Sequence, residues 1–137
     1  RYNNWGHSLR DWGIRKAEGE YIIHFNPDNI LTPNALEILS SYSDDILIFE
    51  VDMMGMEECP QGRFYSDPRD LSKKITITGN PVAYGNIDCM QLVMKRKKWY
   101  SLGGWYDKSE QSDFAIYTKA TKECAPTYVP HVLGEHY

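Results

Sequence analysis

Hydrophobic residues in the first part of the chain recur at helical and then at extended intervals. From 8 to 17 the order Leu9, Trp12, Ile14 and Ala17 predicts an amphipathic helix, and Gly19 is typical of a left-handed helix end. The β-prone run 21–25 predicts a buried strand. Polar residues at 26–29 then break the pattern, so polar loop chemistry is expected at the C-terminal end of a strand.

A helix and a second strand are expected after this polar turn. Thr32 and Pro33 are typical of an N-cap and a first helical residue, and they predict a helix that continues toward Tyr42. The apolar run 46–51 predicts another buried strand. A strand, a helix and a strand over residues 20–51 are typical of a parallel crossover, so the pattern predicts an α/β layer fold.

The second half of the chain is irregular at first and regular later. Glycine and proline recur through residues 52–86, and only 74–78 is strand-like. Long loops are therefore expected in the remainder of 52–86. The elements expected after them are a strand at 89–94, a short helix at 95–100 that ends at Gly103-Gly104, a helix at 112–122 and a brief extended segment at 128–130.

Length and composition favour one globular domain. A chain of 137 residues, 42% hydrophobic and 25% charged, can bury a core and is too short for two domains. Its three cysteines, Cys59, Cys89 and Cys124, form no CxxC pair, so neither a zinc knuckle nor a disulfide framework is expected.

Charge argues against one class of partner. The net charge of -4 offers no broad cationic surface, so nucleic acid is not an expected partner. The one basic run, 95–98, is short, and we interpret it as a solvated helix end. Contact with anionic lipid or with a diphosphate is the alternative for this run.

Four stretches of the chain carry motif-like residues in a fixed order. The first comprises Arg10-Asp11-Trp12-Gly13-Ile14, Ala17-Glu18-Gly19-Glu20-Tyr21-Ile22 and Phe25-Asn26-Pro27-Asp28-Asn29, the second is Leu31-Thr32-Pro33-Asn34-Ala35-Leu36, the third is Gly103-Gly104-Trp105 followed by Ser112-Asp113-Phe114, and the fourth runs from His131 to His136. Together they cover nearly the whole chain. In this order they resemble glycosyltransferase family 2.

The resemblance implies an α/β fold of the GT-A type, a Rossmann-like mixed sheet flanked by helices. Residues 1–137 would be the C-terminal part of that catalytic domain. The family's "sIIiPtyN" strand and "DDgSxD" loop do not occur in the sequence. The chain is therefore expected to lack the N-terminal strands that bind the nucleotide.

The activity implied is transfer of a sugar from a nucleotide-diphospho-sugar donor to a hydroxyl of a glycan, lipid or protein acceptor. Departure of a nucleoside diphosphate builds negative charge that Mn²⁺ or Mg²⁺ can neutralise. Arg10, Asn26 and Asp28 correspond to donor-binding residues, and Asp28 to the metal-binding aspartate. The alternatives to these donor-binding roles are an exposed charge on a helix for Arg10 and a simple turn at 26–29.

Asp113 corresponds to the general base of inverting family members, which takes the proton of the acceptor hydroxyl. Gly103, Gly104, Trp105 and Ser112 correspond to the acceptor site, where glycines allow close approach and a tryptophan offers a flat face to a sugar. The alternatives are a helix cap at Ser112 or Asp113 and a turn with a core tryptophan.

A histidine near the end of the chain is expected to complete the metal site. His131 and His136 are the candidates, and His136 is preferred because Gly134 and Glu135 suggest an exposed, mobile tail. A structural histidine is the alternative. Family members commonly work in the cytoplasm or peripherally at the cytoplasmic face of membranes, so the same localisation is expected here.

Asparagine and serine stand where the family has acids. Asn26 stands at the position of the first acid of the family's DxD motif, and Asn29 stands at the fourth position of the same turn. Ser112 stands where the family has a glutamate before the residue that corresponds to Asp113. One carboxylate remains at the turn, which lowers the expected metal affinity. The competing hypothesis is a degenerate, non-catalytic member of the same fold that binds a sugar or a partner. A nucleotidyltransferase is disfavoured because the sequence has no Gly-rich basic loop.

Overall fold

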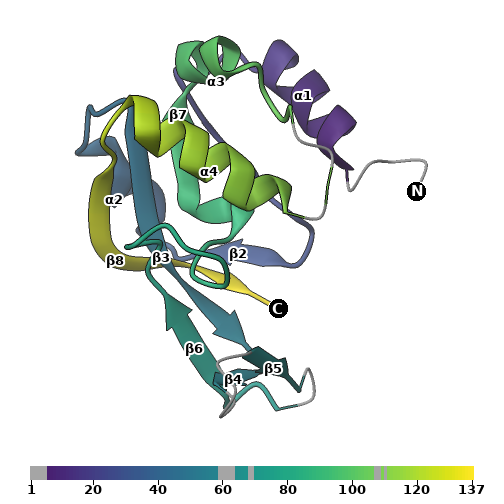
Figure 1. The fold of residues 1–137 in the computed structure, drawn as a ribbon. Helices are drawn as coiled ribbons and strands as arrows, with labels where there is room; N and C mark the ends of the chain where they lie inside the picture. The colour runs from purple at the N-terminus through teal and green to yellow at the C-terminus, as the bar shows by residue number, and fades with distance from the viewer. Residues whose placement is uncertain (1–5, 59–63, 68–69, 107–108, 110) are drawn as a thin grey trace.

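The computed structural model describes residues 6–58, 64–67, 70–106, 109 and 111–137. These residues form a mixed α/β fold around one curled sheet, with a separate two-stranded ribbon at the lower end of the view in Figure 1. The elements, in chain order, are α1 (His7–Lys16), β1 (Tyr21–Ile23), β2 (Asn29–Leu31), α2 (Ala35–Ser40), β3 (Ile46–Met54), β4 (Met56–Glu58), β5 (Phe64–Ser66), β6 (Lys74–Ile77), the 3-10 turn η2 (Cys89–Gln91), β7 (Leu92–Lys95), α3 (Arg96–Leu102), α4 (Ser112–Glu123) and β8 (Thr127–His136).

The main sheet has the order β1-β7-β3-β8-β2, and β6 pairs with the far half of β3. β3 and β8 are parallel, whereas the other pairs are antiparallel. The predicted crossover is therefore confirmed in direction only. β1 and β3 point the same way, but β7 lies between them and pairs with both. The α/β class predicted from the sequence is confirmed.

Strand β3 forms the centre of the core because both of its faces are buried. Ile46 and Ile48 face the apolar layer under α1, α3 and α4, while Leu47, Phe49 and Val51 face the layer that includes α2 and β8. All five side chains are 0–1% exposed. Burial on both faces explains why this strand reads as a continuous apolar run.

Several boundaries predicted from the sequence are wrong, and strand pairing explains most of them. The polar turn ends one residue early, because Asn29 begins β2 at the sheet edge. The region expected to be long loops contains the end of β3 and also β4 and β5, whereas the strand-like run expected at 74–78 is confirmed as β6. These short segments gain ladder hydrogen bonds from partners that no local pattern reveals.

Two helix ends also differ from the prediction. α1 leaves the helical conformation at Ala17, whose φ is -64° and ψ 138°, so Gly19 is not a left-handed end. α2 begins at Ala35, after the N-cap Asn34, and the carbonyl of Thr32 accepts the Ala35 N–H at 3.0 Å. Thr32 and Pro33 therefore form the turn that leads into the helix.

The end of the chain is a strand of the sheet. β8 spans ten residues, Thr127–His136, in place of the brief segment expected at 128–130. Gly134 packs under Met90 and Phe49, where little room remains for a side chain. The predicted mobile tail at Gly134 and Glu135 is therefore wrong, because this stretch is held between β3 and β2.

Aromatic rings fill the space beneath α1 and α3. Trp105 stacks on His7 with ring centroids 5.3 Å apart, and on Trp99 at 5.6 Å. Its indole N–H donates to Nε2 of His24 at 3.0 Å. Burial, chiefly, lowers the pKa of His24 to about 3, so this ring is neutral and accepts that bond.

The Gly103-Gly104 turn ends α3 and leads into Trp105. Both glycines have positive φ, 84° and 66°. The carboxylate of Asp11 on α1 accepts the backbone N–H of Trp105 at 2.7 Å and lies where a Cβ on Gly104 would be. Gly104 therefore needs the absence of a side chain as well as the backbone freedom of glycine. Gly103 faces open space.

The pair Gly103→Ala and Gly104→Ala separates these two requirements. Gly103→Ala is expected to lower the free energy of unfolding by about 1–2 kcal/mol, the cost of a left-handed alanine. Gly104→Ala is expected to cost about 1–3 kcal/mol more, because Asp11 must leave the Trp105 N–H. Denaturant unfolding of both variants measures the difference. Equal costs would contradict the role assigned to Asp11.

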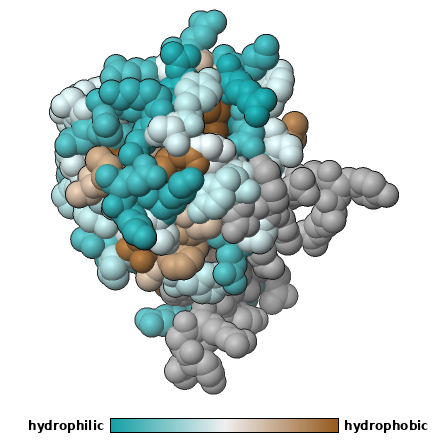
Figure 2. All heavy atoms as spheres, turned by 45° about the horizontal axis from the view of Figure 1, so that its top comes forward, coloured by the Kyte–Doolittle hydropathy of each residue, from teal (hydrophilic) through white to brown (hydrophobic). Residues whose placement is uncertain are grey.

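The end of the molecule that carries α1 and α3 is mostly hydrophilic. Figure 2 turns this end forward and shows polar residues with isolated apolar ones between them. Among the described residues, no helix is long and apolar enough to cross a membrane.

Candidate functional site

Arg10 turns inward from α1 and joins three segments of the chain. Its Nη2 donates to Oδ1 of Asn26 at 3.1 Å, and its guanidinium lies over the Trp105 ring, 4.9 Å from the centroid. Its Nη1 lies 3.0 Å from Nδ1 of His7. The alternative of an exposed helix charge is therefore excluded. Arginine has only donors, so His7 accepts at Nδ1 and carries its proton on Nε2.

Nε2 of His7 contacts two residues at the start of α4. Nε2 of His7 lies 2.8 Å from the hydroxyl of Ser112 and 3.2 Å from the carbonyl of Ser109. Ser112 is buried, at 2% exposure, so its hydroxyl belongs to this internal network. Neither Ser112 nor Asp113 caps α4, because the N-cap is Gln111 and makes no side-chain cap bond.

The turn at 26–29 presents an amide inward and a carboxylate outward. The backbone N–H of Asn26 donates to Oδ1 of Asn29 at 2.9 Å, which closes the turn. The Asn26 amide donates to the Cys89 thiol at 3.4 Å, whereas the side chain of Asp28 is 52% exposed. The backbone carbonyl of Asp28 accepts from Tyr137 N–H at 2.9 Å, which ties the turn to the end of β8.

His136 lies between two aspartates. Its Nε2 is 4.0 Å from Oδ2 of Asp28, and its Nδ1 is 3.3 Å from Oδ2 of Asp88. The hydrogen bond to Asp88, chiefly, raises the pKa of His136. The amide nitrogen of Asn29 also lies 3.0 Å from Nδ1. Nδ1 therefore either accepts from Asn29 or, when protonated, donates to Asp88.

Asp88 is a site residue that the sequence prediction missed. Its Oδ1 accepts the Met90 N–H at 2.9 Å, and Gln91 returns a bond to the Asp88 N–H at 2.7 Å. This capping box at η2 is a recognisable sequence signature that could have located the residue. It could not have shown that the second oxygen faces His136, because that contact joins β8 to the start of η2.

Asp113 occupies the second position of α4, and its carboxyl is half-buried. Burial first, and then the charge of Asp88, raise the pKa of Asp113 to about 6, while Arg10 acts in the opposite direction. No hydrogen bond reaches this carboxyl from the described part of the chain. It is therefore poised to take or give a proton near neutral pH.

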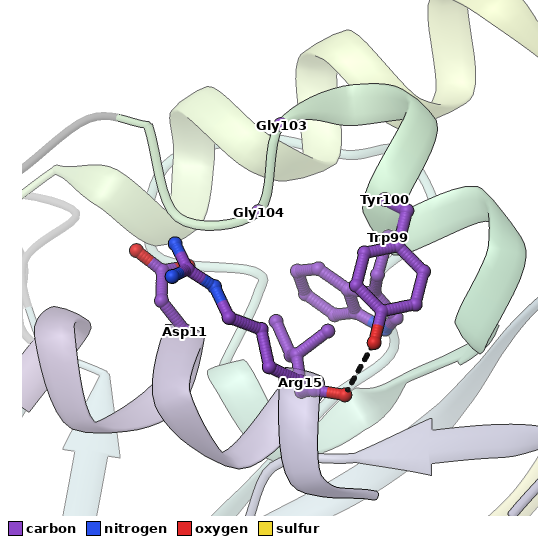
Figure 3. A pocket seen from close by; sticks show the side chains of 7 residues that line it. Asp11, Arg15, Trp99, Tyr100, Gly103 and Gly104 are labelled. Atoms are coloured by element: carbon purple, nitrogen blue, oxygen red, sulfur yellow. Dashed lines mark hydrogen bonds between the residues drawn. The ribbon is translucent and has the colours of Figure 1, made fainter.

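The predicted acceptor residues divide between the interior and a surface pocket. Trp105 is buried at 1% exposure between His7 and Trp99, as expected of a core tryptophan, so its face is not open to a sugar in this conformation. Gly103 and Gly104 border a pocket of about 220 Å³ between α1 and α3. Figure 3 shows Asp11 and Arg15 on one side of this pocket and the two glycines on the other.

Two of the proposed metal ligands are brought together by the fold. Asp28 and His136 are 108 residues apart in the sequence, and Nε2 of His136 lies 4.0 Å from Oδ2 of Asp28. A carboxylate oxygen is a ligand that suits Mn²⁺.

 Asp28 lies on the turn before β2, and His136 lies at the end of β8, which pairs with β2. In the residues that the structure describes, no group of three or more His, Cys, Asp or Glu side chains is arranged to hold a metal ion. The pair fits a cation whose remaining ligands come from water or from a bound diphosphate, as Mg²⁺ sites commonly do.

The site as a whole is a chain of polar contacts that runs from Arg10 through Asn26 and its turn to Asp28, His136 and Asp88. No protein-family model and no curated protein matches the chain. The functional interpretation therefore depends on the chemistry of these residues.

The raised pKa of Asp113 has a direct test by carbon NMR of its carboxyl group. Asp88→Asn removes a nearby negative charge and is expected to lower the pKa of Asp113 below about 6. Arg10→Met removes a stabilising cation and is expected to raise it. In every variant the ionised fraction of Asp113 rises with pH through its pKa, and the substitutions change only the pH at which this occurs.

Asp44→Asn is the matched control for this titration. Asp44 is exposed and is not among the charges that act on Asp113, so its loss is expected to leave the pKa unchanged. A pKa that fails to fall in Asp88→Asn would contradict the electrostatic coupling between the two carboxyl groups.

Proposed function

We propose that this chain belongs to a metal-dependent, inverting glycosyltransferase that moves a sugar from a nucleotide-diphospho-sugar to an acceptor hydroxyl. The observation that carries the proposal is the half-buried carboxyl of Asp113, which accepts no hydrogen bond from the described residues and whose pKa is raised to about 6. A general base works best when its pKa lies near the operating pH. The resemblance of the sequence to glycosyltransferase family 2 supports the same assignment.

Asp113 is the base in this proposal. Its carboxylate takes the proton of the acceptor hydroxyl while that oxygen forms a bond to the anomeric carbon of the donor sugar. The bond from the anomeric carbon to the diphosphate oxygen breaks, and the electron pair leaves with the nucleoside diphosphate. The proton remains on Asp113 until solvent removes it.

Asp28 and His136 would hold the divalent cation, Mn²⁺ or Mg²⁺, which supplies positive charge to the departing diphosphate. For Nε2 of His136 to bind a cation, its proton must lie on Nδ1, where Asp88 is the acceptor at 3.3 Å. A carboxylate behind a metal-binding histidine commonly fixes the ring in this way. Asp88 is therefore a positioning residue for His136.

Arg10 and Asn26 would form the inner wall of the donor site. Both Nη atoms of Arg10 already contact His7 and Asn26, so its proposed contribution is a positive charge held at a fixed place. That charge favours the ionised form of Asp113 and would also attract a diphosphate.

A non-catalytic sugar-binding protein of the same fold is the second candidate. The observation that favours it is the use of Asn26 and Asn29 in bonds within the protein, where carboxylates would bind a cation more strongly. Such a protein would bind a sugar nucleotide without breaking it.

The decisive comparison uses Asp113→Asn in the full-length protein, with a panel of sugar nucleotides and Mn²⁺. Loss of the base is expected to lower the rate of transfer by about 10²–10⁴-fold. Stabilisation of the protein against heat by the nucleotide and Mn²⁺ is expected to persist, because Asp113 does not bind the cation. Asp28→Asn is expected to lose that stabilisation by Mn²⁺.

Asp44→Asn is again the control and is expected to keep both properties. Full transfer activity in Asp113→Asn would refute the assignment of the base. Binding of a sugar nucleotide by the unaltered protein without any transfer or hydrolysis would favour the second candidate.

A further inference from the structure

Positive charge is concentrated on α1, on α3 and on Lys95, the last residue of β7 before α3. Segments 7–16 and 95–102 contain seven of the 15 basic residues of the chain and one acid, Asp11, although the whole chain has a net charge of -4. The seven are Arg10, Arg15, Lys16, Lys95, Arg96, Lys97 and Lys98. Glu18 and Glu20, in the loop after α1, offset part of this charge.

Four of these cations are used within the protein. Arg10 points into the site, and Arg96 donates to the carbonyl of Ala17 at 2.6 Å. Lys95 pairs with Asp45 at 2.9 Å, and Lys98 pairs with Glu123 at 3.2 Å.

The other three cations, Arg15, Lys16 and Lys97, are exposed and make no ion pair within the described part of the chain. The ammonium of Lys16 lies over the Trp12 ring, 5.9 Å from its centroid. These three charges are therefore available to an external anion.

Large apolar side chains stand beside these cations. Leu9 is 72% exposed and Trp12 62% exposed. Spacing of three and four residues places Leu9, Trp12 and Lys16 on one side of α1, opposite the buried His7 and Ile14. A helix face that mixes lysine, tryptophan and leucine is typical of contact with the interface of a bilayer.

α3 lies at the same end of the molecule as α1. The hydroxyl of Tyr100 donates to the carbonyl of Ile14 at 3.1 Å, which joins the two helices, and its side chain is 50% exposed. The helices lie side by side at the top of Figure 1, and Figure 2 shows the hydrophilic surface that they present. A hollow of about 470 Å³ beside these helices has room for a phosphate head group and is lined by Lys95, Arg96, Lys97 and Tyr100 and by the acidic residue Glu20.

We propose that this basic face, formed by Leu9, Trp12, Arg15, Lys16, Lys97 and Tyr100, binds the surface of a bilayer rich in anionic phospholipid. Charge complementarity supplies the attraction, and Trp12 and Leu9 supply the apolar contact with the interfacial layer of the bilayer. The proposal does not depend on the glycosyltransferase assignment. It places α1 between the bilayer and the candidate site, because Arg10 leaves the opposite side of the same helix.

Sedimentation of the full-length protein with vesicles tests the charge requirement. Binding is expected to vesicles that contain phosphatidylglycerol, to weaken with salt, and to be much lower on phosphatidylcholine alone. Lys97→Glu is expected to lower the affinity for anionic vesicles by roughly tenfold or more. Lys73→Glu makes the same charge change beside β6, at the far end of the molecule, and is expected to have little effect.

Fluorescence tests the apolar contact. Emission of the unaltered protein is expected to shift to shorter wavelength on anionic vesicles, and acyl-chain brominated lipid is expected to quench it. Trp5 lies outside the described residues and is replaced by Phe in both proteins compared. In that background Trp12→Phe is expected to lose most of both responses, because Trp99 and Trp105 are buried in the core. Equal binding to neutral and anionic vesicles, equal effects of Lys97→Glu and Lys73→Glu, or preferential binding of RNA over vesicles in competition would overturn the proposal.

Discussion

The backbone ladder between β3 and β8 is the interaction on which the remaining architecture depends. It runs in parallel from Leu47 opposite Thr127 to Met53 opposite His136. The register shifts around Glu50, where Pro130 lies in β8 without an N–H to donate. Beyond this irregularity, β8 carries His136 to the sheet edge where β2 and the Asp28 turn are paired.

Polar contacts within the protein then determine which groups of the site stay open. His7 holds Ser112, Arg10 holds Asn26, and Asp11 holds the Trp105 N–H. Buried polar groups that are paired in this way rigidify a structure, whereas a partly buried carboxyl without a partner has a raised pKa. Ser112, Asn26 and Asp11 therefore belong to the internal hydrogen-bond network, whereas the carboxyl of Asp113 does not.

Local patterns in the sequence predicted the elements whose stability is mainly local or hydrophobic. The run 46–51 and the helix at 112–122 were recognisable because burial follows a regular period there. β2 and the full length of β8 were not, because Asn29 and the residues from 131 onward become strands only through pairing with distant partners. The contact of Asp88 with His136 was not predicted either, because it also joins residues that are distant in the sequence.

Paramagnetic broadening by Mn²⁺ tests most directly the claim that these dispersed residues form one site. In NMR spectra of the full-length protein with Mn²⁺ and a nucleoside diphosphate, the amide signals of Asp28, Asp88, Asp113 and His136 are expected to broaden, because the effect falls steeply with distance. Signals from Thr127, at the opposite end of the ten-residue strand β8, are expected to stay sharp. Broadening that spares the four residues, or that centres on another part of the chain, would contradict the account.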